Sequence, residues 1–371
     1  MMRIGFDAKR YFLNRTGLGN YSRDLIRILE THYPENTYLK YSPKLNSALL
    51  PQTANAEANI KLPQGFWGKK LPSLWRSRWI VQDLLRDQID LFHGLSGEIP
   101  VGLAKSSIKS VVTIHDLIFL RYPELYKPLD RWIYNKKSLH AVQAADKIIA
   151  ISQQTKQDIM EYYSISPDKI EVIYQGCHPA FQVKKSAEEK QKLREKYKLP
   201  EQFILNVGSI EPRKNALQIV KAIEHLDVPL LIIGKSTSYA EEIKKYISEK
   251  GLSHRILIKQ GFTMEELATI YSMASIFVYP SKFEGFGIPI IEALYSGTPV
   301  ITNQKGVFPE AGGPFSYYVD PENIDNLSYA IETVLQNTTM QEEMRKQGLV
   351  YAQQFNDEVI AKQLINCYTN L

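Results

Sequence analysis

The sequence predicts an α/β protein of two domains, each built on a parallel β-sheet. Its length of 371 residues exceeds the roughly 250–300 residues over which one hydrophobic core usually extends. In both halves of the chain, short apolar runs alternate with helical patterns, which is typical of βαβ units and parallel sheets. The composition, 44% hydrophobic and 23% charged, excludes collagen-like, disordered and coiled-coil proteins.

The short apolar runs are predicted to be strands. Those in the first half lie at 3–6, 91–93, 110–114 and 147–151. In the second half the pattern is more regular, with runs at 203–207, 230–233, 255–259, 276–279, 299–302 and 317–319. The chain carries no short internal repeat, which argues against solenoids and propellers.

The predicted domains are 1–180 and 181–356. A polar stretch separates them, and in it Ser186 and Glu189 have the spacing of a capping box that opens a helix. The last segment, 357–371, is predicted to be a helix that docks on another part of the protein, because its apolar residues share one face. These residues are Val359, Ile360, Leu364, Cys367, Tyr368 and Leu371.

The net charge of +5 is unevenly distributed along the chain. Residues 1–180 carry 24 Lys and Arg against 17 Asp and Glu, whereas residues 181–371 carry 21 against 23. A basic N-terminal half favours an anionic partner there, such as a phospholipid surface or a phosphate-bearing acceptor. No recognised nucleic-acid-binding module is present, so no nucleic-acid partner is expected.

Cysteine content and hydropathy predict a cytoplasmic protein. Cys177 and Cys367 are too few for a disulfide framework or a zinc cluster, and they indicate a reducing compartment. No uncharged apolar run approaches the ~18 residues of a transmembrane helix. The first residues resemble a strand more than a secretion signal.

Contact with the inner face of a membrane stays open as an alternative. The segment 66–79 mixes basic side chains with the large aromatic residues Phe66, Trp67, Trp75 and Trp79. We favour the interpretation that the tryptophans pack inward, because Pro63 and Pro72 break any long amphipathic helix.

The most informative segment is predicted to run from a strand through a glycine-containing loop into a helix. This helix is predicted to begin around Ile288–Pro289 and to end near Gly297. The backbone N–H groups of the loop would point outward at the helix N-terminus, which makes an anion site. The loop residues are Gly285, Phe286 and Gly287.

Two glutamates flank this anion site. Glu284 precedes the loop and Glu292 lies on the second turn of the helix, so both are predicted to reach one ligand. Carboxylates accept pairs of hydroxyl hydrogen bonds, which suits a ligand with phosphates and vicinal diols. The alternative is that both acids are solvent-exposed surface residues, as acids usually are.

A second phosphate-handling loop follows the predicted strand 203–207. Gly208 allows a tight exit, and Arg213 and Lys214 are brought to the carboxyl edge of the sheet, where open α/β sheets bind ligands. Two cations there can neutralise a departing diphosphate. The alternative is an exposed basic pair at the start of a helix, which the helix dipole disfavours.

The first half of the chain carries weaker motifs. Gly17 and Gly19 form a G-x-G without the third glycine of the dinucleotide fingerprint, so a nicotinamide enzyme is poorly supported. They form either a flexible loop with a glycine-permitted turn or a contact to phosphate or acceptor. His115, and more weakly His93, ends a predicted strand at the ligand edge, where it is either functional or a satisfied structural histidine.

Several catalytic motifs are absent from the sequence. It contains no Asp-x-Asp pair, no HExxH, no spaced Cys/His set, no Gly-Lys-Ser/Thr phosphate loop and no serine nucleophile elbow. These absences argue against an Asp-x-Asp metal site for nucleotide sugars and against zinc hydrolysis. We expect no metal and no bound cofactor.

Together the motifs resemble the retaining family 4 glycosyltransferases, also called glycosyl transferases group 1. The resemblance covers nearly the whole chain, and its most specific part is the E-x7-E block with Gly-Phe-Gly. It also includes the N-terminal glycine loop and the segments 113–116, 172–176 and 211–215. The family implies the GT-B fold, in which two Rossmann-like domains turn parallel sheets toward an interdomain cleft.

The resemblance implies a role for each motif. The catalytic set is His115, Arg213, Lys214 and Glu284. The donor-binding set is Gly17, Gly19, Ser209, Phe262, Gly285, Phe286, Gly287, Ile288 and Glu292. Ser209 departs from relatives that carry arginine there, so we expect the positive charge at the site to come from the two basic residues of the catalytic set.

The activity implied is retaining transfer of a hexose, with mannose as one candidate, from a nucleotide diphosphate sugar to a saccharide or lipid-linked saccharide acceptor. Cell-surface polysaccharide synthesis is the expected context. The first domain, with helix 357–371 returning to it, would bind the acceptor, and the second the nucleotide sugar. A nucleotide-sugar epimerase, against which the E-x7-E block argues, and a non-catalytic sugar-nucleotide-binding subunit remain as alternatives.

Overall fold

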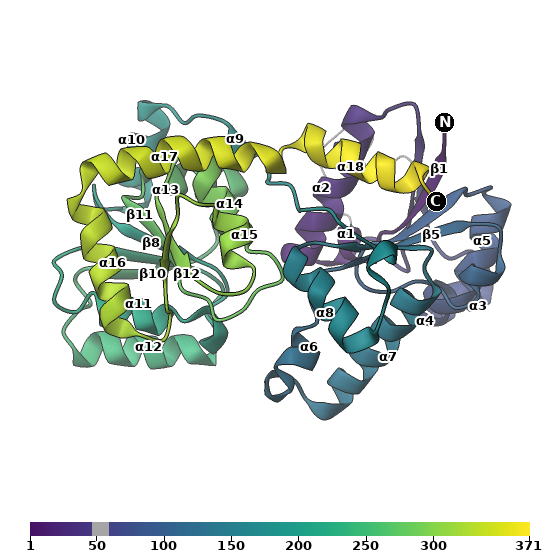
Figure 1. Ribbon diagram of the computed structural model, residues 1–371, viewed down its shortest axis with the longest axis horizontal. Helices are drawn as coiled ribbons and strands as arrows, with labels where there is room; N and C mark the ends of the chain where they lie inside the picture. Colours follow the sequence, from purple (N-terminus) through teal and green to yellow (C-terminus); the bar gives the residue numbers. More distant parts are fainter. Residues whose placement is uncertain (47–58) are drawn as a thin grey trace. The chain divides into compact units, whose positions relative to one another are not determined.

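The computed structural model describes residues 1–46 and 59–371. These residues form two compact units (Figure 1). The first consists of Met1–Gly176 together with Asp357–Leu371, and the second of Cys177–Asn356. Each unit has its own parallel sheet and its own buried aliphatic core.

The first unit contains a seven-stranded sheet in the order β3-β2-β1-β4-β5-β6-β7. Its strands are β1 Arg3–Asp7, β2 Thr37–Tyr41, β3 Ile60–Lys61, β4 Leu91–Gly94, β5 Lys109–Ile114, β6 Lys147–Ala150 and β7 Ile170–Val172. Its helices are α1 Lys9–Leu13, α2 Gly17–His32, α3 Gly65–Lys70, α4 Pro72–Leu74, a π-helix Trp75–Trp79, α5 Ile80–Arg86, α6 Ile118–Arg121, α7 Pro128–Ala144, α8 Gln153–Tyr163 and α18 Asp357–Thr369.

The second unit contains a six-stranded sheet in the order β10-β9-β8-β11-β12-β13. Its strands are β8 Ile204–Val207, β9 Leu230–Ile233, β10 Ile256–Lys259, β11 Ile276–Tyr279, β12 Val300–Asn303 and β13 Tyr317–Val319. Its helices are α9 Pro179–Gln182, α10 Ala187–Tyr197, α11 Ala216–Ala222, α12 Ser238–Glu249, α13 Met264–Met273, α14 Ile288–Tyr295, α15 Phe308–Gly312, α16 Ile324–Gln336 and α17 Thr338–Ala352.

The two parallel sheets confirm the predicted fold class. Every predicted strand is present, with ends that shift by at most one residue. The strands β2, β3 and β7 were not predicted, because they are short or carry charged residues. Lys40 of β2 is buried to 1% exposure and needs Glu30 of α2 to compensate its charge at 2.6 Å, a pairing that no local pattern reveals.

Strand order reverses once in each sheet, between β1 and β4 in the first unit and between β8 and β11 in the second. Loops that leave the carboxyl ends of two such strands diverge to opposite sides of the sheet and open a crevice between them. Open α/β sheets bind ligands at this switch point. Each unit therefore has one edge at which a ligand site is expected.

Candidate active site

Two loops of the second unit meet at its switch point. One follows β8 and holds residues 208–215, and the other follows β11 and holds residues 280–287. Because β8 and β11 are parallel neighbours, both loops leave the same edge of the sheet. The structure thereby brings Lys214 against Glu284, 70 residues further along the chain.

Four donors converge on one oxygen of Glu284. Its Oε1 lies 2.5 Å from Lys214 Nζ and 2.8 Å from Arg213 Nη1. Ser281 Oγ donates to the same oxygen at 2.7 Å, and the Tyr279 hydroxyl donates at 3.0 Å. Within the described part of the chain, no hydrogen-bond partner is found for the other carboxylate oxygen, Oε2.

Solvent reaches this cluster only slightly. The exposed fractions of the side chains are 20% for Arg213, 13% for Lys214 and 12% for Glu284. The alternative interpretation of Glu284 as a solvated loop acid is therefore wrong. The same holds for the interpretation of Arg213 and Lys214 as an exposed basic pair.

The buried part of the cluster carries two cations and one anion, and a second acid, Glu211, lies 3.8 Å from Arg213 with 44% of its side chain exposed. Burial alone would raise the pKa of Glu284, but Lys214 and Arg213 outweigh it and hold that pKa below its usual range. Glu284 is therefore ionised at neutral pH. Burial is also the main reason that the pKa of Lys214 is lowered, with neighbouring Arg213 acting in the same direction. An anionic ligand is the chemical species that best complements this excess of positive charge.

Glu292 lies on the second turn of α14 and is 8% exposed, so its interpretation as a surface residue is also wrong. The hydroxyl of Tyr271 on α13 donates to Glu292 Oε2 at 3.0 Å. Burial and the neighbouring carboxylate raise the pKa of Tyr271 well above its usual value, so the phenol stays a donor. The carboxylate is thus held in a defined orientation.

The loop before α14 is anchored by its aromatic side chain. Phe286 is 2% exposed, and its ring lies 5.5 Å from that of Phe355. Gly287 caps the helix with φ 109°, a left-handed conformation that disfavours any side chain. Half-buried Ile288 is the first helical residue, and Gly285 is also half-buried. The Phe286 ring therefore packs inside the second unit.

Ser209 and Phe262 are less closely tied to this cluster. Ser209 follows Gly208 at the end of β8 and is half-buried. Phe262 follows β10, two strands away from β8 in the sheet. Its ring packs against Tyr197 of α10, with 4.6 Å between the ring centroids.

His115 follows β5 in the first unit and has both ring nitrogens engaged. Nε2 donates to the carbonyl of Leu95 at 2.9 Å, so Nδ1 accepts from the Gln175 amide at 3.2 Å. Burial lowers the pKa of His115 to about 4. The imidazole is therefore neutral at neutral pH. The Tyr21 ring packs edge-on against it, with 4.5 Å between the ring centroids. These contacts suit a positioning role better than proton transfer.

The two N-terminal glycines are helical residues of α2, so their interpretation as a flexible loop with a glycine turn is wrong. A Cβ on Gly19 would lie 1.9 Å from the carbonyl oxygen of Asn14, which explains why a glycine is needed there. A Cβ on Gly17 would meet nothing within 4 Å. Packing among the described residues therefore gives no reason for a glycine at position 17.

His93 is a satisfied structural histidine. It is fully buried, and its nitrogens are hydrogen-bonded to Thr113 at 2.8 Å and to Tyr368 at 2.7 Å. Burial lowers its pKa to about 3. Tyr368 belongs to α18, which also packs against α2 and pairs Asp357 with Arg27 at 2.7 Å.

Two family models match the chain, Glycosyltransferase Family 4 over residues 17–181 and Glycosyl transferases group 1 over residues 188–350. The chain belongs to the family 4 (group 1) glycosyltransferases. O-antigen chain mannosyltransferase B of Escherichia coli is 28% identical over 99% of both chains. A serotype-specific mannosyltransferase WbdA of E. coli is 31% identical over 76% of this chain and 36% of its own length.

Solved structures share the fold of this glycosyltransferase. Anabaena HepE, solved in complex with UDP and glucose, has a TM-score of 0.80 at 19% identity over the whole of both chains. WaaG, a glycosyltransferase involved in lipopolysaccharide biosynthesis, has a TM-score of 0.71 at 16% identity and covers 97% of this chain and 98% of its own. Both therefore support the GT-B fold.

Several side chains of the glycosyltransferase's candidate sites were missed from the sequence. Tyr279 and Ser281 were not predicted as site residues, although they lie close before Glu284 in the sequence. Tyr271 lies on another helix, and no local pattern links it to Glu292. Gln175 was noticed only as part of a family segment, and its contact with His115 spans 60 residues.

The aromatic segment of the glycosyltransferase divides into buried and exposed residues. Trp75 is 3% exposed and donates from Nε1 to Asp83 at 2.7 Å. The prediction that the tryptophans of this segment pack inward is therefore right for Trp75. Phe66 and Trp67 on α3 are 69% and 63% exposed, so that interpretation is wrong for Trp67.

Residues 1–46 and 59–371 lack two features, a helix able to span a membrane and a group of side chains able to hold a metal ion. None of the helices there has the length and apolarity needed to cross a membrane. Nor do three or more His, Cys, Asp or Glu side chains group in a way that could hold a metal ion.

Proposed function

We propose that this glycosyltransferase transfers a hexose, and specifically mannose, from a nucleotide diphosphate sugar to a saccharide or lipid-linked saccharide with retention of anomeric configuration. The observation that carries the proposal is the cluster of Arg213 and Lys214 on Glu284, whose excess positive charge complements a diphosphate. Mannose and cell-surface polysaccharide synthesis are supported by the E. coli relatives and by the O-antigen chain mannosyltransferase RfbU of Salmonella typhimurium, 29% identical over 61% of this chain.

In this proposal the second unit binds the nucleotide sugar and the first unit binds the acceptor. Arg213 and Lys214 bind the diphosphate, and the amides of Gly285–Gly287 add backbone donors at the start of α14. Oε2 of Glu284 accepts from the hydroxyls of the sugar. Glu292, oriented by Tyr271, accepts from the ribose.

The cluster supports retention through the donor's own phosphate. A double displacement needs a carboxylate that is free to attack the anomeric carbon. Glu284 is a poor candidate, because four donors already bind its Oε1 and its Oε2 is assigned to the hydroxyls of the sugar. As the bond from the anomeric carbon to the phosphate oxygen breaks, that oxygen takes the acceptor's hydroxyl proton. The acceptor oxygen then bonds to the anomeric carbon on the same face, and the nucleotide diphosphate leaves with the proton.

The test is a panel of α-linked UDP-, GDP- and ADP-sugars with a mannoside acceptor. Release of nucleotide diphosphate identifies the donor, and proton NMR of the first-formed product gives its configuration. The proposal expects a nucleotide diphosphate mannose as the best donor, with the panel identifying its base, and an α-linked product. A β-linked product contradicts the mechanism, and a better non-mannosyl donor contradicts the choice of sugar.

We also propose that the first unit contacts the cytoplasmic face of a membrane. This proposal is supported by the exposed Phe66 and Trp67 beside Lys69 and Lys70 on α3 and by the basic charge of residues 1–180. Co-sedimentation with vesicles that contain anionic phospholipid is expected to weaken when Phe66 and Trp67 are both replaced by serine. Equal co-sedimentation of the two proteins would contradict it.

A further inference from the structure

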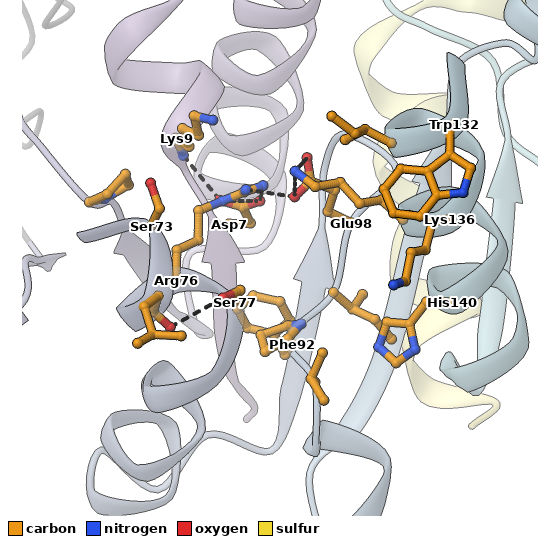
Figure 2. A pocket seen from close by; sticks show the side chains of 17 residues that line it. Asp7, Lys9, Ser73, Arg76, Ser77, Phe92, Glu98, Trp132, Lys136 and His140 are labelled. Atoms are coloured by element: carbon orange, nitrogen blue, oxygen red, sulfur yellow. Dashed lines mark hydrogen bonds and ion pairs between the residues drawn. The ribbon is translucent and has the colours of Figure 1, made fainter. Parts of the chain in front are cut away.

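A cavity of about 730 Å³ opens at the switch point of the first unit (Figure 2). Its volume is typical of cavities that enclose a small-molecule ligand. We call it the switch-point cavity. It lies among the end of β1, the segment after β4, the π-helix and α7, and its lining includes Asp7, Lys9, Arg76, Glu98, Trp132 and Lys136.

Most charges around the cavity compensate one another. Arg76 pairs with Asp7 and, at 2.7 Å, with Glu98, while Lys137 reaches Glu98 at 3.3 Å. Burial alone would raise the pKa of Asp7, but Arg76 holds it below its usual range. These two acids and two bases leave no net charge. Arg76 joins Asp7, the last residue of β1, to Glu98 in the segment after β4 (Figure 2).

Two amines at the cavity remain without a carboxylate. Among residues 1–46 and 59–371, no acidic side chain pairs with Lys9 or Lys136. Lys9 is half-buried, and burial together with the nearby Arg76 lowers its pKa, so an anionic ligand would relieve an unfavourable environment. Lys136 Nζ lies over the ring of Trp132, 5.1 Å from its centroid. The cavity therefore has a surplus of about two positive charges for a ligand.

The rest of the lining is largely apolar. Phe92 of β4 is 1% exposed, and Ile99 beside it is 7% exposed. Trp132 stands at the cavity with 59% of its surface exposed, which is unusual for so large an apolar side chain. His140 from the same helix contributes a solvent-shielded Nε2 for which no partner is found in the described part of the chain. The cavity thus combines unpaired amines with apolar walls.

We propose that the switch-point cavity binds the phosphate-bearing, lipid-linked end of the acceptor, with Lys9 and Lys136 attracting the phosphates and Phe92, Ile99 and Trp132 contacting the apolar chain. A neutral saccharide would leave the half-buried amine of Lys9 uncompensated and would make no use of the exposed amine of Lys136, and a free phosphorylated saccharide would leave the apolar walls unused. The inference rests on the proposed function, since it names the acceptor class of that reaction.

Tryptophan fluorescence provides a readout that is independent of catalysis. All four tryptophans, at positions 67, 75, 79 and 132, lie in the first unit, and Trp132 lines the switch-point cavity itself. The full-length protein is titrated with farnesyl diphosphate, which carries both chemical groups. Farnesol carries the chain alone, and inorganic pyrophosphate carries the anion alone.

Farnesyl diphosphate is expected to change the emission saturably, with a Kd about tenfold below that of either partial probe. Lys9→Ala and Lys136→Ala are each expected to raise this Kd by about threefold or more. Lys127→Ala, which removes an exposed lysine that does not line the cavity, is the matched control and is expected to leave it unchanged. Lys9→Arg and Lys136→Arg keep the charge and are expected to restore binding, which separates charge from folding.

Several outcomes overturn the proposal. Pyrophosphate binding as tightly as farnesyl diphosphate would identify a free-phosphate site, and farnesol binding as tightly would identify an apolar site. Equal Kd values for the alanine variants and the wild type, or an emission change that Trp132→Phe leaves intact, would place the probe elsewhere. Sugar transfer by a protein that fails this titration refutes this inference alone, whereas tight binding without transfer refutes the proposed function alone.

Discussion

Replacing Lys214 by alanine removes one of the two cations that we assign to the departing diphosphate. Its Nζ lies 2.5 Å from Glu284 Oε1 with 13% of the side chain exposed, so solvent screens its charge poorly. Loss of one positioned charge-stabilising donor costs about 3 kcal/mol in the transition state, or about a hundredfold in kcat. Arg213 stays 2.8 Å from the same oxygen, so Glu284 keeps a partner and the protein is expected to fold.

The assay is steady-state release of nucleotide diphosphate under saturating donor, with thermal unfolding as the check on folding. Lys214→Arg keeps a charge and is expected to lose less activity than the alanine variant. Lys244→Ala is the matched control, because Lys244 is 51% exposed on α12 and pairs only with a surface acid, Glu241. A kcat for Lys214→Ala within about threefold of the wild type would refute the assignment of this lysine to the leaving group.

Four further predictions concern the two acids, the histidines and metal. Glu292→Ala should raise the donor KM more than it lowers kcat, because a ribose contact is equally strong in the ground state and the transition state. Glu284→Gln should mainly lower kcat. If both variants change KM and kcat in the same way, the two roles are contradicted. Activity should survive dialysis against EDTA, and a loss that Mg²⁺ or Mn²⁺ reverses would show a metal requirement. His115→Ala should keep part of the wild-type kcat with an unchanged profile over about pH 6 to 8, because an imidazole of pKa about 4 is already neutral there. Folding lowers the pKa values of His93 and His115 to about 3 and about 4, so below about pH 6.5 the unfolded chain binds more protons than the folded protein. The free energy of unfolding should therefore decrease as the pH falls below about 6.5. This decrease should be less steep in His115→Gln.

Local sequence determined which segments become strands and where the loops between them lie. Buried parallel strands are continuous apolar runs, and this pattern was sufficient for β1, β4, β5, β6 and the regular series from β8 to β13. The apolar pattern did not reveal β2, because this strand contains the charged Lys40. Lys40 is buried in the structure, where Glu30 on α2 compensates its charge at 2.6 Å. Glycine and proline also predicted the loop before α14, since Gly287 has a left-handed backbone and Pro289 lies in the first turn.

Contacts between distant segments were decided by the tertiary structure. No spacing rule predicts that four donors meet on one oxygen of Glu284, because β8 and β11 become neighbours only when the strand order reverses. The same reversal between β1 and β4 brings Asp7 and Glu98 to Arg76 and forms the switch-point cavity. Burial also decides the charge state of His115, which cannot be inferred from its neighbours in sequence. Residue type and periodicity thus specify elements and chemistry, while pairing, burial and charge state depend on the three-dimensional neighbours that the sheet topology supplies.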